Sequence, residues 1–138
     1  MSLNPDLVRA RCDEIEESVK RLEQFQPLTR EEFLANRDTI DIACHRLLIA
    51  CEASLALCYH VSAKQLRKVP EEHAECFGLL REAGLVSADL AGRLQQMARF
   101  RNLLVHVYWK VDYGQVYEVI QKHLKDLRDF RAAMARLL

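Results

Sequence analysis

The chain has 138 residues, half of them apolar, which fits a single folded domain with one hydrophobic core. Only 4 glycines and 3 prolines interrupt it, too few for a fold of many strands joined by tight turns. Lysine plus arginine and aspartate plus glutamate both number 20, so the formal net charge is zero. Such a chain is not a polycation drawn to any nucleic acid or acidic membrane, so RNA binding requires a local basic patch.

The N-terminal quarter predicts a long helix and then a short one. Asn4 followed by Pro5 is typical of a helix start. Apolar residues then recur at spacings of three and four, as on one face of an amphipathic helix: Leu7, Val8, Cys12, Ile15, Val19 and Leu22. The Gln26-Pro27 pair ends this helix. Thr29 and Glu32 have the spacing of a capping box, which predicts a short helix from there.

A long helix is expected over residues 37–62. It contains the run 47–63, 17 residues whose only charge is Glu52. The run is slightly short for a membrane span, and a carboxylate in its middle would be costly in lipid. We therefore predict a buried helix and no membrane partner.

The second half of the chain continues the helical pattern. One helix is expected after Pro70, ending near Gly84, and the next is capped by Ser87. Asp112 and Gln115 have the spacing of another capping box and predict a final helix that runs to the end of the chain. The fold class is therefore all-α: an antiparallel bundle of about five helices, with residues 1–138 forming one domain.

The five cysteines are an odd number, and no signal peptide is apparent before them: Cys12, Cys44, Cys51, Cys58 and Cys76. This predicts a reduced, cytoplasmic protein. Three of them are spaced by seven residues along one helix, too far apart to bridge one another, and are expected to pack as small apolar residues. No paired Cys/His spacing of a zinc site occurs, so no metal ligand and no cofactor is predicted.

Residues 91–111 form the densest basic stretch in the chain, because they contain four basic residues and no acid: Arg93, Arg99, Arg101 and Lys110. His106 lies in this stretch, and Asn102 shares a helix face with it at spacing i, i+4. Arg101 and Tyr108 would stack along an adjacent face if the helix continued. Such a face suits a phosphodiester, with His106 moving a proton and Arg101 holding the non-bridging oxygens.

The segment Arg101-Asn-Leu-Leu-Val-His106-Val-Tyr108 resembles the Arg-x4-His-x-Tyr motif of the HepT toxins, a branch of the HEPN superfamily of all-α ribonucleases. Composition alone gives this spacing in about one or two chains in a hundred. The resemblance also extends to residues 28–33, to the apolar second helix and to residues 111–117, in the same order as in that family. It therefore covers essentially the whole chain.

The resemblance implies a metal-independent endoribonuclease toxin that forms a homodimer and acts on RNA such as tRNA. Arg101 and His106 would be its catalytic pair, supported by Asn102. A partner nucleotidyltransferase, the MntA-like antitoxin, would attach AMP to Tyr108 and thereby silence the toxin. The chemistry implied is attack of a ribose 2′-OH on the adjacent phosphate, which needs no metal to make a nucleophile.

Residues outside the motif have less specific roles. Glu52 needs a partner in its apolar run, and two roles stay open: orienting Arg101 or His106, or a structural salt bridge or place at the edge of a dimer cleft. Arg99, Lys110 and Trp109 are the candidate RNA contacts, with Trp109 expected in a turn. Phe100, Tyr113 and Tyr117 also flank the basic stretch and could stack on unpaired bases, although helix packing explains Phe100 and Tyr117 at least as well. The remaining histidines are expected at the surface or at helix caps: His45, His60, His73 and His123.

Two other functions compete with the ribonuclease. A non-catalytic HEPN-like dimer that binds a nucleotidyltransferase or a nucleotide would share the fold and Tyr108 but would not need His106. A cysteine-based redox sensor would need a thiol that reacts as a thiolate at neutral pH.

Overall fold

A computed structural model of the chain describes residues 2–138, with the side chain of Tyr108 outside the description. Within these residues there are seven α-helices and no strand, so the all-α prediction is confirmed and the count of about five is wrong. The helices are α1 (Pro5–Glu23), α2 (Arg30–Ala35), α3 (Arg37–Val61), α4 (His73–Glu82), α5 (Ala88–His106), α6 (Tyr113–Lys122) and α7 (Leu124–Ala135). A π-helical turn (Ser62–Leu66) extends α3, and a 3-10 turn (Tyr108–Lys110) follows α5.

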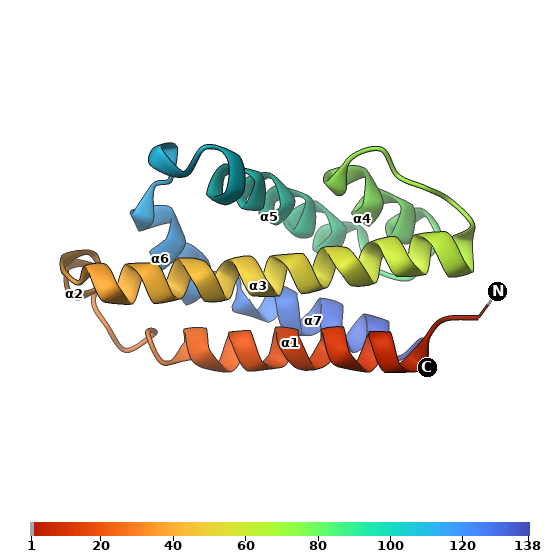
Figure 1. Cartoon of the computed structure of the whole chain (residues 1–138), viewed down its shortest axis with the longest axis horizontal. Helices are drawn as coiled ribbons and strands as arrows, with labels where there is room; N and C mark the ends of the chain where they lie inside the picture. Colours follow the sequence, from red (N-terminus) through yellow and green to blue (C-terminus); the bar gives the residue numbers. More distant parts are fainter. Residues whose placement is uncertain (1) are drawn as a thin grey trace.

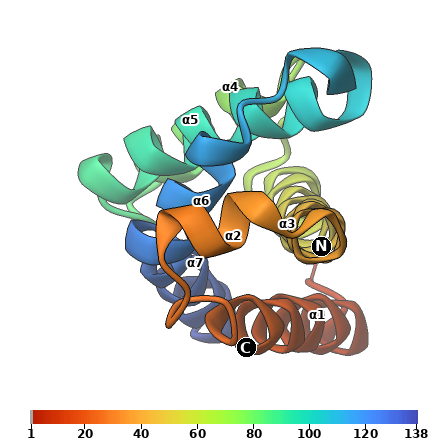
Figure 2. The same cartoon turned by 90° about the vertical axis from the view of Figure 1, so that its left-hand side faces the viewer.

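The long helices α1 and α3 lie side by side and antiparallel along the long axis of the molecule (Figure 1). In the end view, α4 and α5 lie on one side of α3, and α1 and α7 lie on the other (Figure 2). The short helices α2 and α6 pack against each other at one end. Both chain termini lie near the opposite end (Figure 1).

The helix ends follow local chemistry at most of the expected positions. The Asn4 side chain accepts hydrogen bonds from the first turn of α1, and Ser87 accepts one from Leu90 N at 3.1 Å. Thr29 and Glu32 form the expected capping box at α2. Gly84 follows α4 with a φ of 76°, a left-handed conformation that glycine adopts without steric cost.

The final helix differs from the prediction. It divides at His123, whose φ of −122° and ψ of 4° are not helical, so α6 packs on α2 while α7 packs on α1. Neither glycine nor proline marks this break in the sequence. Asp112 does cap α6, but its carboxylate accepts from Gly114 N at 2.8 Å rather than from the expected partner Gln115.

The buried apolar side chains form one contiguous core to which every α-helix contributes. The helix over residues 37–66 is the one described segment long and apolar enough to cross a membrane, which is weak evidence for a span. More than half of its apolar window, 56%, is buried inside the protein. That burial is usual for the central helix of a bundle.

His60, near the end of α3, accepts a hydrogen bond from the backbone N of Asn4 at 3.0 Å and so holds the start of α1. Burial lowers the pKa of His60 below its ordinary value of 6.5, and the charge of Lys64 lowers it further. Protonation would remove the acceptor atom. The contribution of this hydrogen bond to stability is therefore fully present when the pH lies above 6.5, the ordinary pKa of histidine. It is lost as the pH falls through the lower pKa that His60 has in the folded protein.

We expect a matching pH dependence of unfolding. Between about pH 7.5 and pH 5, the wild type should lose roughly 2–4 °C more of its melting temperature than His60→Gln, which keeps an acceptor that does not titrate. Thermal unfolding followed by circular dichroism measures this difference. His45→Gln, an exposed histidine on the same helix, is the control and should behave as the wild type does. Equal pH dependence in His60→Gln and the wild type would contradict the assignment.

Candidate functional site

The motif residues lie on the last turns of α5 and on the turn that follows it. Helix α5 ends at His106 because Val107 leaves helical geometry, with a φ of −135° and a ψ of 50°. Tyr108 therefore does not continue the helix. Arg101 and Tyr108 were expected to share a helix face only if it did, so that expectation does not hold. The side chain of Tyr108 lies outside the described residues.

A groove of about 590 Å³ lies beside this end of α5. Its walls come from α5 and from the start of α4, with the lining residues Glu71, Glu72, His73, Ala74, Ala98, Arg99, Asn102, Leu103, His106 and Val107. Asn102 and His106 share one face of α5, as their spacing predicts, and both line the groove. Arg99, a predicted RNA contact, lines it as well. The structure thus brings these three residues together.

Arg101 projects toward α3 instead of lining the groove. Its Nε donates to the carboxylate of Glu52, in an ion pair that joins α5 to α3. A second nitrogen, Nη1, donates to Oδ1 of Asn102 at 3.1 Å. The Arg101 side chain is only 14% exposed, so these two contacts hold its guanidinium in a defined place. Arg101 is linked to the groove through Asn102. The Glu52 side chain is 48% exposed, so burial does not require a partner for it, and its pairing with Arg101 matches one of the roles left open for it.

The other predicted RNA contacts lie at the edge of the molecule. Trp109 and Lys110 belong to the 3-10 turn, as expected for Trp109, and this turn projects at the periphery of the bundle (Figures 1 and 2). The Trp109 side chain is 79% exposed. Neither residue is among those described as lining the groove.

Two of the remaining aromatic residues are packing residues. Phe100 is buried, and Tyr117 packs on Phe33 with 5.5 Å between ring centroids. The Tyr117 hydroxyl donates to the backbone oxygen of Leu28 at 2.7 Å. Helix packing, not base stacking, explains these two rings.

Sequence analysis missed the second wall of the groove. His73 begins α4 and faces the same space as His106, together with Glu71 and Glu72. No motif spacing connects residues 73 and 106, which lie on consecutive helices joined by the loop 83–87 and come together through the packing of α4 on α5. The groove is also less basic than the stretch 91–111 suggests. The carboxylates of Glu71 and Glu72 line it, and the charge of Arg101 is paired with Glu52.

The cysteines are placed largely as packing residues, with one exception. Cys58 and Cys76 form a disulfide between α3 and α4, so the expectation of five reduced thiols is wrong for this pair. Cys12, Cys44 and Cys51 are free and buried. Burial raises the pKa of Cys44 to about 11 and that of Cys51 to about 12. Thiols of this kind do not react as thiolates at neutral pH, which argues against a redox sensor built on them.

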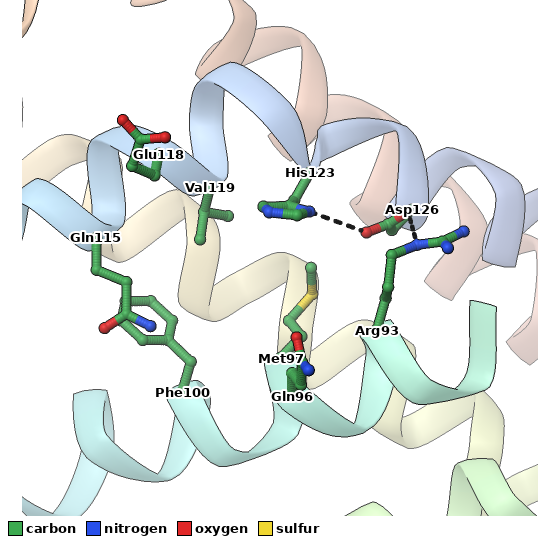
Figure 3. A pocket seen from close by; sticks show the side chains of 9 residues that line it. All are labelled: Arg93, Gln96, Met97, Phe100, Gln115, Glu118, Val119, His123 and Asp126. Carbon is green, nitrogen blue, oxygen red and sulfur yellow. Dashed lines mark hydrogen bonds and ion pairs between the residues drawn. The ribbon is translucent and has the colours of Figure 1, made fainter. Parts of the chain in front are cut away.

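A second, smaller cavity of about 120 Å³ lies between α5 and the helices α6 and α7 (Figure 3). Asp126 lies at one end of it, where its carboxylate accepts from Arg93 Nε at 2.8 Å and lies 3.4 Å from His123 Nδ1. Asp126 is buried, so these contacts compensate for its removal from water. The Arg-x4-His pair takes no part in this cavity, whose charged groups tie α5 to α7.

Within residues 2–138, no group of three or more His, Cys, Asp or Glu is arranged to hold a metal ion, so no metal ligands are assigned.

Comparisons with known proteins agree with the family that the sequence resembles and with the fold. The family model described as ribonuclease HepT-like matches residues 15–134. The mRNA nuclease HepT of Shewanella oneidensis is 26% identical over 125 residues, which span 91% of this chain and 93% of that protein.

Solved structures show the same architecture. The tri-AMPylated HEPN toxin of Shewanella oneidensis, in complex with MNT antitoxin, superposes with a TM-score of 0.87 and 25% identity over 95% of this chain and 98% of that one. A toxin-antitoxin structure with AMP-PNP gives a TM-score of 0.83 at 24% identity, over 94% of this chain and 98% of that one. Because its identity to this chain is only 24%, the structure with AMP-PNP shows likeness of fold alone.

Proposed function

Because the chain belongs to the ribonuclease HepT-like family, we propose that it is an endoribonuclease toxin of a toxin–antitoxin pair that cuts RNA without a metal ion. The observation that carries this proposal is the arrangement at the end of α5. There Arg101, held by Glu52 and Asn102, is linked to a groove that His106 lines. A guanidinium held in a defined place and an accessible imidazole, both near the end of one helix, supply groups that suit phosphodiester cleavage.

The reaction proposed is transesterification within the RNA. The ribose 2′-oxygen forms a bond to the adjacent phosphorus as it loses its proton, and the bond from phosphorus to the 5′-oxygen breaks. The products are a 2′,3′-cyclic phosphate and a 5′-OH end. His106 transfers protons, and Arg101 stabilises the charge that develops on the pentacoordinate phosphorus. The substrate supplies its own nucleophile, so the protein needs only acid–base and electrostatic groups.

Contacts to the RNA extend beyond the groove. Arg99 lines the groove and is placed to contact a phosphate, while Lys110 and the exposed ring of Trp109 lie on the turn after α5. Lysine and arginine neutralise phosphates, and an exposed indole stacks on an unpaired base. We propose RNA as the substrate, in keeping with the name mRNA nuclease of the relative.

The partner proposed is an MntA-like nucleotidyltransferase that acts as antitoxin, because the similar HEPN toxin is AMPylated and bound to MNT antitoxin. The modified residue would be Tyr108, two positions beyond His106. Each AMP adds a negative charge and considerable bulk at the end of α5, which would repel and block the RNA backbone.

We also propose a cytoplasmic homodimer, for which light scattering at micromolar concentration should give twice the mass of the chain.

The test of the function is RNA cleavage in excess EDTA. Purified protein, shown by mass to carry an unmodified Tyr108, is incubated with total cellular RNA, and the fragment ends are identified. We expect cleavage that leaves 2′,3′-cyclic phosphate and 5′-OH ends at an unchanged rate in EDTA. Cleavage that disappears in EDTA would overturn the metal-independent mechanism. No cleavage at all would favour the non-catalytic dimer that binds a nucleotidyltransferase.

A further inference from the structure

The groove contains a second histidine in addition to the motif histidine. His106 lies on the α5 wall and His73 on the α4 wall, and both line the same space of about 590 Å³. Transesterification moves two protons, one away from the 2′-oxygen and one onto the departing 5′-oxygen. Two imidazoles on two walls match this requirement, because histidine serves as acid or base near neutral pH.

One contact to the ring of His73 and two contacts of nearby residues of α4 position this histidine. Its ring makes an edge contact with the ring of Tyr59 on α3, with 5.8 Å between centroids. The next residue, Ala74, accepts a hydrogen bond through its backbone oxygen from Gln95 Nε2 of α5 at 3.0 Å. One turn later, Cys76 joins α4 to α3 through the disulfide with Cys58. These contacts hold the backbone around His73 and one edge of its ring, so the side chain is kept at the α4 wall of the groove.

The charges around the groove differ between its two walls. Glu71 and Glu72 line it on the side of His73, and Glu75 follows one turn along α4. Arg99 lines it on the side of His106. The two walls therefore differ in charge, with carboxylates beside His73 and a guanidinium beside His106.

Tyr59, the ring against which His73 packs, is influenced by charged groups of α4 and α5. Burial raises the pKa of Tyr59, the carboxylate of Glu75 raises it further, and the positive charge of Arg101 opposes both. Through the ring contact with His73, Tyr59 of α3 supports the α4 wall of the groove.

We propose that His73 is the second proton-transfer group of this site, the general acid, and that His106 is the base. The inference rests on the proposed ribonuclease function and deepens it. His106 takes the proton of the 2′-OH as the 2′-oxygen bonds to phosphorus. The imidazolium of His73 gives its proton to the 5′-oxygen as the bond from that oxygen to phosphorus breaks. The next cycle requires exchange of one proton between the site and water.

The experiment uses the full chain and two versions of one oligonucleotide that spans a site cut by the wild type. In one version the departing 5′-oxygen is replaced by sulfur. A thiolate leaves without protonation, because a thiol is far more acidic than an alcohol. His73→Ala should therefore slow cleavage of the ordinary linkage by about 10²-fold or more, yet stay within about threefold of the wild type on the sulfur linkage. His106→Ala should lose activity on both.

The controls separate this proposal from a structural role and from failure of the function itself. His45→Ala removes an exposed histidine of α3 and should match the wild type on both linkages. His73→Gln keeps a polar side chain and should show the same pattern as His73→Ala, with an unchanged melting temperature. Wild-type rates for both His73 variants on the ordinary linkage, or equal losses on both linkages, would overturn the acid role while leaving the ribonuclease intact. A wild type that cuts neither linkage would overturn the proposed function and this inference with it.

Discussion

Replacing His106 with alanine is expected to lower the rate of RNA cleavage by about 10²- to 10⁴-fold, the range that a positioned acid–base group supplies. His106 lines the groove at the end of α5, and its side chain is exposed. Truncation there should therefore change the free energy of unfolding by less than about 0.5 kcal/mol. Single-turnover cleavage of a mapped RNA site, together with urea unfolding, measures both quantities.

The Arg101–Glu52 pair provides an internal comparison for this result. Glu52→Gln keeps the size of the side chain but removes the charge that holds the guanidinium, so we expect a smaller loss of cleavage than in His106→Ala. Retention of the wild-type rate in His106→Ala would remove the proposed mechanism. A His106→Ala protein that unfolds at markedly lower urea would instead show that the histidine supports the fold.

Replacing Phe130 with alanine is expected to destabilise the protein by about 3–5 kcal/mol, which lowers its melting temperature by on the order of 10 °C. Phe130 lies on α7, is 0% exposed, and packs edge-to-face on Phe77 of α4 at 5.5 Å between ring centroids. Its removal would leave a cavity where these two helices meet. The midpoint and slope of urea unfolding measure the loss.

Two variants calibrate that loss. Phe130→Leu retains most of the buried volume and should cost about 1–2 kcal/mol. Trp109→Ala removes an aromatic ring that is 79% exposed, so it should change the free energy of unfolding by less than about 0.5 kcal/mol. A cost below about 1 kcal/mol for Phe130→Ala would show that the bundle collapses around the missing ring.

The helix starts illustrate what was predictable along the chain. Asn4, Thr29 and Ser87 each bond to backbone groups within three residues, and Gly84 ends α4 through its own backbone conformation. Such interactions lie within a single turn, so a local pattern is enough to predict them. His123 has no such local mark, which is why the division between α6 and α7 was missed.

The groove illustrates the opposite case. His73 and His106 belong to helices whose pairing no sequence spacing encodes, although each helix is predictable by itself. Glu52 and Arg101, 49 positions apart, form an ion pair between α3 and α5, and the sequence left this role of Glu52 open beside others. Cys58 and Cys76, 18 residues apart, meet because the end of α3 packs against α4.

The sequence by itself determined the all-α class, most helix boundaries, the Arg-x4-His-x-Tyr motif and, through that motif, the family. Each of these depends on residues within one or two helical turns, or on a linear spacing that survives in any fold. Only the tertiary structure decided that α4 supplies the second wall of the groove and that Glu52 holds Arg101. It also decided that two histidines share one space. Such contacts join residues dozens of positions apart, and they form only when buried helix faces pack together to remove apolar surface from water.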